Sequence, residues 1–125
     1  MGTRYLLDTN VILDFMSGKL PVNAQKIFSM IVDTEINLSV INKIELLGFS
    51  KLEQNIIDFV NYANIFPLDN SIVDKTIAIR GFYKIKLPDT IIAATALVNS
   101  FTLVSNNIKD FKNIQNIQLI NLYEI

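Results

Sequence analysis

The sequence contains neither cysteine nor histidine among its 125 residues. Without cysteine, the chain can form no disulfide, no thiolate nucleophile and no sulfur-ligated zinc or iron site. Without histidine, it has no imidazole base, no Ser-His or Cys-His nucleophile pair and no imidazole-bound metal. Any hydrolytic chemistry therefore has to use carboxylates, lysine, tyrosine, or a metal ion held by oxygen ligands.

The sequence also lacks a charge excess and long apolar runs. It has 11 basic and 12 acidic residues, so its overall charge does not indicate a protein that coats nucleic acid. No run approaches the roughly 20 apolar residues of a membrane span. The apolar stretch from Tyr5 is interrupted at Asp8, which is unlike a signal peptide. We expect a soluble, cytoplasmic protein that does not enter a membrane.

Length and composition predict one folded domain. Half of the residues are hydrophobic and 18% are charged, which favours a packed core and excludes a disordered chain. A chain of this length buries enough surface to fold without a disulfide or a structural metal. Since there is no repeat, low-complexity tract or linker, we expect a single domain over residues 1–125.

Short apolar segments alternate with segments of helical periodicity. Strands are predicted at residues 5–7, 36–40, 65–68, 101–104 and 118–122. Helices are predicted after a cap at Thr9 or Asn10, and at 22–32, 42–51, 53–64, from the capping residues 69–71 through 82, and at 89–99. This alternation is typical of an α/β fold in which helices cover both faces of a parallel sheet.

Four acidic residues occupy unusual positions in this pattern. Asp8 directly follows the first predicted strand, and Asp110 follows the fourth within a few residues. Glu45 shares a helical face with apolar residues, where a carboxylate has to be paired, protonated or metal-bound. Asp89 follows Pro88 at the start of a helix whose small residues allow close approach to the sheet. Ligand sites of such folds lie beyond the carboxyl ends of the strands, where the strand order reverses.

Each of these acids also has an ordinary explanation. Asp8 and Asp89 could cap the helices that follow them, Glu45 could pair with a lysine, and Asp110 could be a loop residue. Taken together, the three aspartates project from one sheet edge, and Glu45 can close the ring from a neighbouring helix. Converging carboxylates without basic partners repel one another, and a divalent cation relieves that repulsion. Oxygen ligands suit magnesium or manganese, which can activate water against a phosphodiester.

Four segments resemble the PIN-domain nucleases, specifically the VapC-like ribonuclease toxins of bacterial and archaeal toxin–antitoxin modules. The segments are residues 6–14, 39–49, 84–96 and 103–111. Their order and spacing match the family across nearly the whole chain. The resemblance implies a three-layer α/β/α sandwich with a central parallel sheet.

The resemblance also implies an activity and partners. It predicts an endoribonuclease that depends on Mg²⁺ or Mn²⁺, forms a homodimer, cleaves RNA and is held inactive by a cognate antitoxin protein. The residues implied to be catalytic and metal-binding are Asp8, Glu45, Asp89 and Asp110. The residues implied to support them are Asn10, Ser105 and Asn107.

Two positions depart from the family pattern. Ser105 stands where threonine is frequent and keeps the hydroxyl, whereas Asn106 stands where arginine is common. Because the chain has only two arginines, a grip on phosphate would have to use lysines near the site. The candidates are Lys43, Lys84, Lys86 and Lys109.

The alternative function is a non-catalytic PIN-like module for binding or scaffolding. All four acidic positions are filled, which argues against that alternative. A dinucleotide-binding domain would need a glycine-rich turn where Asp8, Thr9 and Asn10 stand. A phosphoaspartate phosphatase would need a second aspartate at the position of Asn10.

Overall fold

The computed structural model describes residues 2–125. Its strands are β1 (Tyr5–Leu7), β2 (Asn37–Ser39), β3 (Asn64–Phe66), β4 (Thr102–Val104) and β5 (Gln118–Ile120). Its helices are α1 (Thr9–Met16), α2 (Val22–Thr34), α3 (Val40–Leu47), α4 (Gln54–Asn61), α5 (Asn70–Arg80), α6 (Leu87–Val98) and α7 (Ile108–Phe111), followed near the C-terminus by a 3₁₀ turn at Leu122–Glu124. Within these residues, no helix is both long enough and apolar enough to cross a bilayer.

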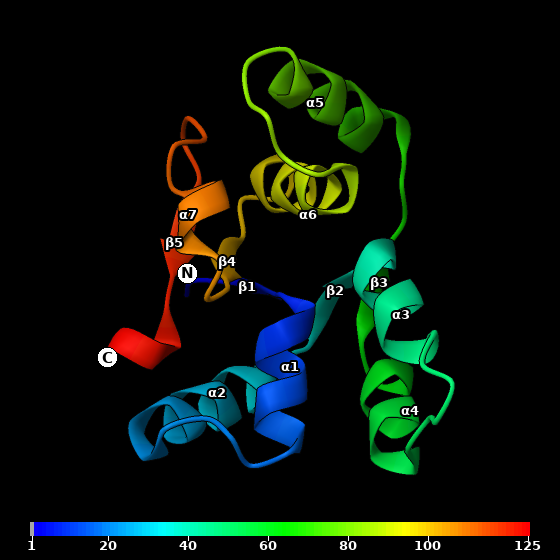
Figure 1. Cartoon of the computed structure of the whole chain (residues 1–125), viewed down its shortest axis with the longest axis vertical. Coiled ribbons are helices and arrows are strands. Elements are labelled where there is room, and N and C mark those ends of the chain that lie inside the picture. Colours follow the sequence, from blue (N-terminus) through cyan, green and yellow to red (C-terminus); the bar gives the residue numbers. More distant parts are fainter. Residues whose placement is uncertain (1) are drawn as a thin grey trace.

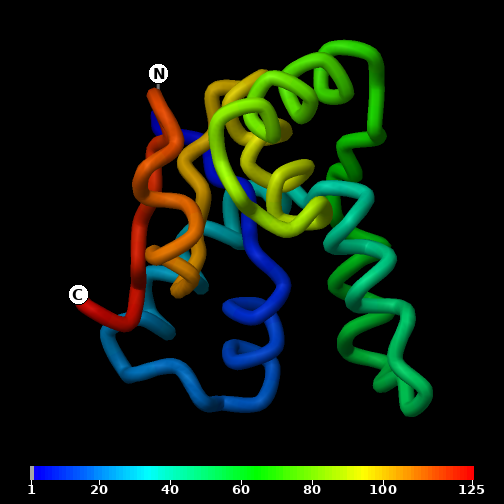
Figure 2. Tube along the Cα trace, turned by 45° about the horizontal axis from the view of Figure 1, so that its top comes forward, coloured from blue at the N-terminus to red at the C-terminus, as the bar shows by residue number. Residues whose placement is uncertain are grey.

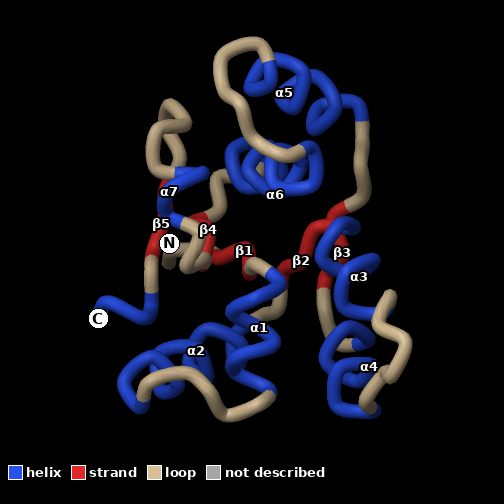
Figure 3. Tube along the Cα trace, in the orientation of Figure 1, coloured by secondary structure: helices blue, strands red, loops and turns tan. Residues whose placement is uncertain are grey.

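The strands form a parallel layer across the middle of the molecule. Backbone hydrogen bonds join β1, β4 and β5 into one part and β2 and β3 into another, and all pairings are parallel. Figure 3 shows β2 next to β1 on the side away from β4, so the layer reads β5-β4-β1-β2-β3. Figures 1 and 2 agree that α3 and α4 lie at the opposite end of the layer from β5. The predicted α/β class with a central parallel sheet is confirmed.

The two faces of the layer are covered by different helices. Successive strand residues point to opposite faces, so Leu6 and Leu7 enter two separate hydrophobic cores. Leu7 packs with residues of α1, α2 and α4, whereas Leu6 packs with residues of α5, α6 and α7. Figure 1 shows α1 and α2 on one side of the strands and α5 and α6 on the other. This is the expected α/β/α sandwich.

A buried side chain links the two parts of the sheet at the β1–β2 seam. Asn37 is fully buried, and its Nδ2 donates hydrogen bonds to the Tyr5 carbonyl oxygen at 2.9 Å and to Glu35 Oε2 at 2.6 Å. Its Oδ1 accepts a hydrogen bond from Asn64 Nδ2 at 3.1 Å. Glu35 also forms an ion pair with Arg4 at 2.8 Å. Side-chain hydrogen bonds therefore connect β1 to β2 at this seam.

Several element boundaries differ from the predicted ones. Asp8, rather than Thr9 or Asn10, is the N-cap of α1, because its side chain accepts a hydrogen bond from the Thr9 amide. The second strand stops at Ser39, whose hydroxyl caps α3. That helix ends at Leu47 instead of residue 51, and α4 ends at Asn61 instead of residue 64.

Two further elements were not predicted. The first is the short helix α7, which forms where a loop is expected around Asp110. The second is a 3₁₀ turn, which follows the last strand after that strand stops at Ile120. α7 is a single turn whose apolar residue Phe111 is fully buried in the same hydrophobic core as Leu6. Tertiary packing therefore stabilises a helix that is too short to be recognised from periodicity.

Candidate active site

A hollow of about 690 Å³ lies beyond the carboxyl ends of β1 and β4, where the strand order reverses. All four of the predicted acidic residues line it: Asp8, Glu45, Asp89 and Asp110. They come from the end of β1, from α3, from the first turn of α6 and from α7, respectively. Thus the fold gathers on one surface acids that are far apart in the sequence.

Asp8 is held on both carboxylate oxygens. Its Oδ1 accepts a hydrogen bond from the Thr9 amide at 2.9 Å, and its Oδ2 accepts one from the Ser105 hydroxyl at 2.7 Å. The side chain is 7% exposed, and this burial raises the pKa of Asp8 above its ordinary value. The two hydrogen bonds oppose that rise, and the charge of Glu45 adds to it. Asp8 therefore both caps α1 and faces the hollow with a fixed orientation.

Glu45 is exposed and not embedded among apolar residues, which corrects the sequence-based interpretation. Ile44, beside it on α3, is itself 62% exposed, so this part of the helix surface is open to solvent. The carboxylate is not paired with a lysine either. Its Oε1 accepts a 2.6 Å hydrogen bond from the Thr9 hydroxyl.

Thr9 and Asn42 are polar residues that the sequence analysis did not connect with the acids. Asn42 is fully buried, its Nδ2 donates to Thr9 Oγ1 at 3.0 Å, and its Oδ1 accepts from the Ser39 amide at 2.8 Å. The Ser-x-x-Asn spacing of a helix start, with Glu45 one turn further on, is the sequence signal that could have found this contact.

Ser105 and Asn107 connect Asp8 with Asp110. The Ser105 hydroxyl donates to Asp8 and accepts a hydrogen bond from the Asn107 amide at 2.9 Å. The Asn107 side chain donates to Asp110 Oδ2 at 3.1 Å. Together with Thr9 and Asn42, these contacts form one polar chain that joins three of the acids, from α7 to α3.

Asp89 is half-buried and its carboxylate lies among like charges. Burial raises its pKa, the charges of Asp8, Asp110 and Glu45 raise it further, and Lys86 opposes the rise. The N-cap of α6 is Lys86, and that cap makes no side-chain hydrogen bond. The capping explanation for Asp89 is therefore not realised in its geometry, although the start of a helix favours an acid electrostatically.

The four carboxylates are spread around the hollow instead of converging on one point. Among residues 2–125, no three acidic side chains are close enough together to chelate a cation as they stand. Asp8, Glu45 and Asp110 are each turned toward a hydrogen-bond donor of the polar chain. The donor set is nevertheless made of oxygen, and its four carboxylates outnumber the one lysine of the lining, which suits Mg²⁺ or Mn²⁺. Rotation of these side chains is needed before they can share an ion.

The remaining predicted residues are divided between two hollows. Asn10 lines the acidic hollow and also a neighbouring one of about 420 Å³, which contains Asn106. Among the four candidate lysines, Lys86 lines the acidic hollow, whereas the other three are outside its lining. A single lysine is therefore placed to attract phosphate at the acids.

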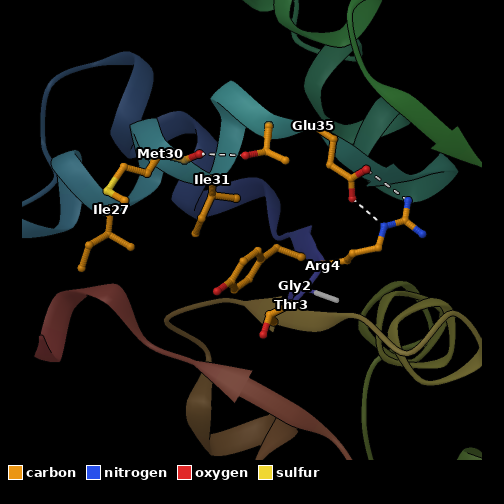
Figure 4. Close-up of a pocket in the computed structure, with 9 residues that line it drawn as sticks. Gly2, Thr3, Arg4, Ile27, Met30, Ile31 and Glu35 are labelled. Atoms are coloured by element: carbon orange, nitrogen blue, oxygen red, sulfur yellow. Dashed lines mark hydrogen bonds and ion pairs between the residues drawn. The ribbon is translucent and has the colours of Figure 1, made fainter.

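A separate hollow of about 510 Å³ lies near the start of β1 (Figure 4). It is bounded by residues 2–5 of the N-terminal segment and by α2, including Ile27 and Met30. Its charged residues, Arg4 and Glu35, are already paired with each other. Because it holds no free acid or base for catalysis, we do not consider it a candidate active site.

The PIN domain family matches residues 5–117 of this chain. A comparison with curated proteins gives no match. Among solved structures, a toxin–antitoxin complex from Klebsiella pneumoniae contains a chain that is 31% identical, with a TM-score of 0.76 and coverage of 97% of this chain and 99% of that one.

Two other solved structures are similar over almost their whole length. One is VapBC2 from Rickettsia felis bound to a DNA fragment from its promoter, with 27% identity, a TM-score of 0.78, and coverage of 95% of this chain and 98% of that one. The other is FitAcB from Neisseria gonorrhoeae, with 25% identity, a TM-score of 0.76, and coverage of 97% and 99%. The chain therefore belongs to the PIN domain family and is VapC-like.

Proposed function

We propose that this protein is a metal-dependent endoribonuclease that hydrolyses RNA phosphodiester bonds and acts as the toxin of a toxin–antitoxin pair. The observation that carries the proposal is the hollow of a PIN domain lined by Asp8, Glu45, Asp89 and Asp110. A chain without histidine or cysteine has few other means of activating water. The filled acidic positions favour catalysis over a purely scaffolding role.

The same four carboxylates would hold Mg²⁺ or Mn²⁺. A cation held there would supply positive charge near the phosphodiester and would lower the pKa of water for in-line attack. The chain contributes orientation: Ser105 fixes Asp8, Thr9 fixes Glu45 and Asn107 fixes Asp110. Outer contacts of this kind determine how well acidic side chains can bind an ion.

The other groups of the hollow act on the substrate. Lys86 attracts an RNA phosphate to the acids, and Asn10 orients water or a phosphate oxygen. The pKa values of Asp8 and Asp89 are both raised, but both oxygens of Asp8 already accept hydrogen bonds, which leaves Asp89 as the better candidate to accept the proton of the attacking water. These assignments make Asp89 the residue whose charge matters most for turnover.

The proposed partners follow from the solved relatives. The similar chain from Klebsiella pneumoniae is part of a toxin–antitoxin complex, which supports a cognate antitoxin for this protein. The antitoxin would keep the acidic hollow from RNA until it is removed. We also propose that residues 1–125 form a single domain and that the toxin is a homodimer. It would act in the cytoplasm, where its RNA substrate is found.

Cleavage of RNA by the antitoxin-free protein tests the proposal. We expect cleavage of single-stranded RNA with Mg²⁺ or Mn²⁺, no cleavage in excess chelator, and no cleavage by an Asp89→Asn variant. Cleavage that persists undiminished in chelator would contradict the metal requirement. A folded wild-type protein that binds its antitoxin but cuts no RNA with either ion would instead support the scaffold alternative.

A further inference from the structure

The acidic hollow has an aromatic side that the proposed hydrolysis does not use. Phe49 lines the hollow together with the four carboxylates, and its side chain is 46% exposed. Two other apolar residues, Leu13 and Ile44, line the same hollow. One part of the site is thus acidic and polar, whereas another part presents apolar surface and a partly open ring.

The position of Phe49 depends on how α3 ends. Gly48 is the C-cap of that helix, and a Cβ at this position would lie 2.6 Å from the Ile44 carbonyl oxygen. A larger residue at position 48 would therefore force the backbone to move. The glycine permits the close turn that places the next residue, Phe49, at the hollow immediately after a helix that carries Glu45.

The acidic hollow also continues into the second one. Asn10 and Leu13 line both, and the second hollow adds Lys19 beside two acids, Asp14 and Glu53. Lys86 lies in the first hollow and Lys19 in the second, so each has one lysine in its lining. The two hollows therefore share part of their lining, which mixes these lysines and amide side chains with carboxylates.

We propose that Phe49 is a stacking platform that positions one unpaired base beside the carboxylates, with the strand continuing over Asn10 toward Lys19. This inference rests on the proposed ribonuclease function and adds a residue that selects the substrate. Proteins that bind single strands combine backbone-tracking cations with aromatic rings on which bases of any sequence stack. A base inside a duplex is already stacked and paired, so Phe49 favours single-stranded RNA.

The groups around the ring favour RNA over a second copy of this chain as its occupant. Lys86, Asn10 and Asn107 line the same hollow as Phe49, and such groups contact phosphates and base edges. The carboxylates repel RNA phosphates as well, and the cation of the proposed function offsets that charge, whereas a symmetric contact through this hollow would double the number of carboxylates. Association through Phe49 is therefore an outcome that the experiment has to distinguish.

A fluorescence experiment tests stacking without requiring turnover. The chain has no tryptophan, so Phe49→Trp introduces a single reporter at the hollow. In an Asp89→Asn background, where RNA stays intact, titration with a single-stranded oligouridylate should quench its emission to saturation. The same length of duplex RNA should quench it much less. The control is Tyr62→Trp, because Tyr62 is 83% exposed and lies outside both hollows.

Steady-state cleavage then separates positioning from chemistry. We expect Phe49→Leu to raise KM for single-stranded RNA by about 10-fold with little change in kcat, and Phe49→Tyr to restore the wild-type KM. Ile44→Ala, which alters the same apolar part of the site without removing a ring, should have a smaller effect. An abasic nucleotide next to the cleaved bond should cause the same loss as Phe49→Leu, with no further loss when the two are combined.

Different failures have different meanings. Absence of quenching, or an unchanged KM in Phe49→Leu, overturns the stacking role while leaving wild-type cleavage, and so the proposed function, intact. A Phe49→Leu variant with unchanged KM that runs as a smaller species in size-exclusion chromatography assigns the ring to a contact between copies. A wild-type protein that cuts no RNA with either cation refutes the proposed function. If it also shows no quenching, the stacking inference fails with it.

Discussion

The hydroxyl of Thr9 donates a 2.6 Å hydrogen bond to Oε1 of Glu45, so the residue after the first acid holds the second one in place. The same hydroxyl accepts a hydrogen bond from Asn42, which orients its single proton toward the carboxylate. Glu45 is exposed, and an exposed glutamate has several free rotamers. The contact with buried Thr9 therefore selects one orientation of a side chain that would otherwise be mobile.

Replacing Thr9 by valine keeps the shape of the side chain and removes the hydroxyl. We expect Thr9→Val to lower cleavage or metal affinity by about 10- to 100-fold, the usual cost of losing an outer contact to a metal-binding side chain. It also leaves buried Asn42 without an acceptor, which should cost about 1–3 kcal/mol of stability. Thr9→Ser retains the hydroxyl and should recover most activity. Equal activity of the valine and serine variants would show that the hydroxyl does not matter.

Removing the Asp89 charge should separate stability from function. Asp89→Asn is expected to abolish cleavage while leaving the metal-free protein at least as stable as the wild type. The variant relieves repulsion from Asp8, Asp110 and Glu45, worth at most about 1 kcal/mol after solvent screening. With manganese the wild type should become the more stable protein, because its folded state binds the ion more tightly and therefore gains more stability. Thermal melts of both proteins in chelator and in millimolar manganese measure these stabilities. The prediction is contradicted if the variant has the lower Tm in chelator and manganese raises the Tm of both proteins equally.

The pH dependence of stability should report the two raised aspartates. The pKa values of Asp8 and Asp89 lie above the ordinary value of an aspartate, so the folded state binds these protons more tightly than the unfolded chain. Their contribution to stability is therefore fully present below the ordinary aspartate pKa of the unfolded chain and is lost as the pH rises through the raised pKa values of the folded state. In chelator, the free energy of unfolding of Asp89→Asn should exceed that of the wild type by an amount that grows as the pH rises through the raised pKa of Asp89. A difference that is independent of pH would argue against a raised pKa at Asp89.

The pH dependence of wild-type stability alone would not isolate the contributions of Asp8 and Asp89. The Arg4 guanidinium, and then Asn37, lower the pKa of Glu35, so that group adds stability as the pH rises. Its contribution has the opposite sign to that of Asp8 and Asp89. Since Arg4 and Glu35 are unchanged in the variant, the difference between the two proteins removes their effect.

Asn37 should contribute more to stability than its small size suggests. Asn37→Ala removes a fully buried side chain that donates to the Tyr5 carbonyl oxygen and accepts from Asn64, and it leaves a cavity at the seam. We expect a loss of about 2–3 kcal/mol, measured by urea denaturation. Gln54→Ala is the control, because the Gln54 side chain donates a hydrogen bond to Asp58 at an exposed position and its removal should cost about 1 kcal/mol or less. Equal losses of unfolding free energy in the two variants would show that the hydrogen bonds of Asn37 stabilise the fold no more than an exposed hydrogen bond does.

The cognate antitoxin is expected to use the negative charge of the hollow. A segment of it should lie across the acids and present an arginine or lysine to Asp8, Glu45 or Asp89, since a basic group there neutralises the cluster and displaces the cation. A structure of the complex, together with loss of manganese binding on complex formation, checks this. A complex in which the hollow stays open and manganese binds as before would rule out this form of inhibition.

The sequence predicts most of the fold because its signals are local. The three-residue strand at 5–7 is a short apolar run, and the helix from residue 87 carries Pro88 in its first turn, where proline is tolerated. The ends of helices were predicted less well. α3 ends at its C-cap Gly48, where a Cβ would lie 2.6 Å from the Ile44 carbonyl oxygen, whereas the apolar periodicity alone continues to residue 51.

The candidate site was predicted in its acids but not in the contacts between them. Asp8, Glu45, Asp89 and Asp110 could be recognised individually by their positions relative to the predicted elements. Their hydrogen-bond partners could not, because such contacts join residues as distant as Asp8 and Ser105, which are 97 positions apart. Glu45 was expected among buried apolar residues, yet the helix exposes that face, since no other element covers Ile44.

The seam between β1 and β2 has a thermodynamic consequence for the hollow. Asp8 and Asp110 belong to the part built on β1, β4 and β5, whereas Glu45 follows β2 on the other side of the seam. A cation shared by these acids would bridge the two halves of the sheet, so its binding energy would oppose their separation. Occupancy of the site and closure of the seam would then be reciprocally linked, and each would strengthen the other. Amide hydrogen exchange at β2 should therefore slow when the ion binds.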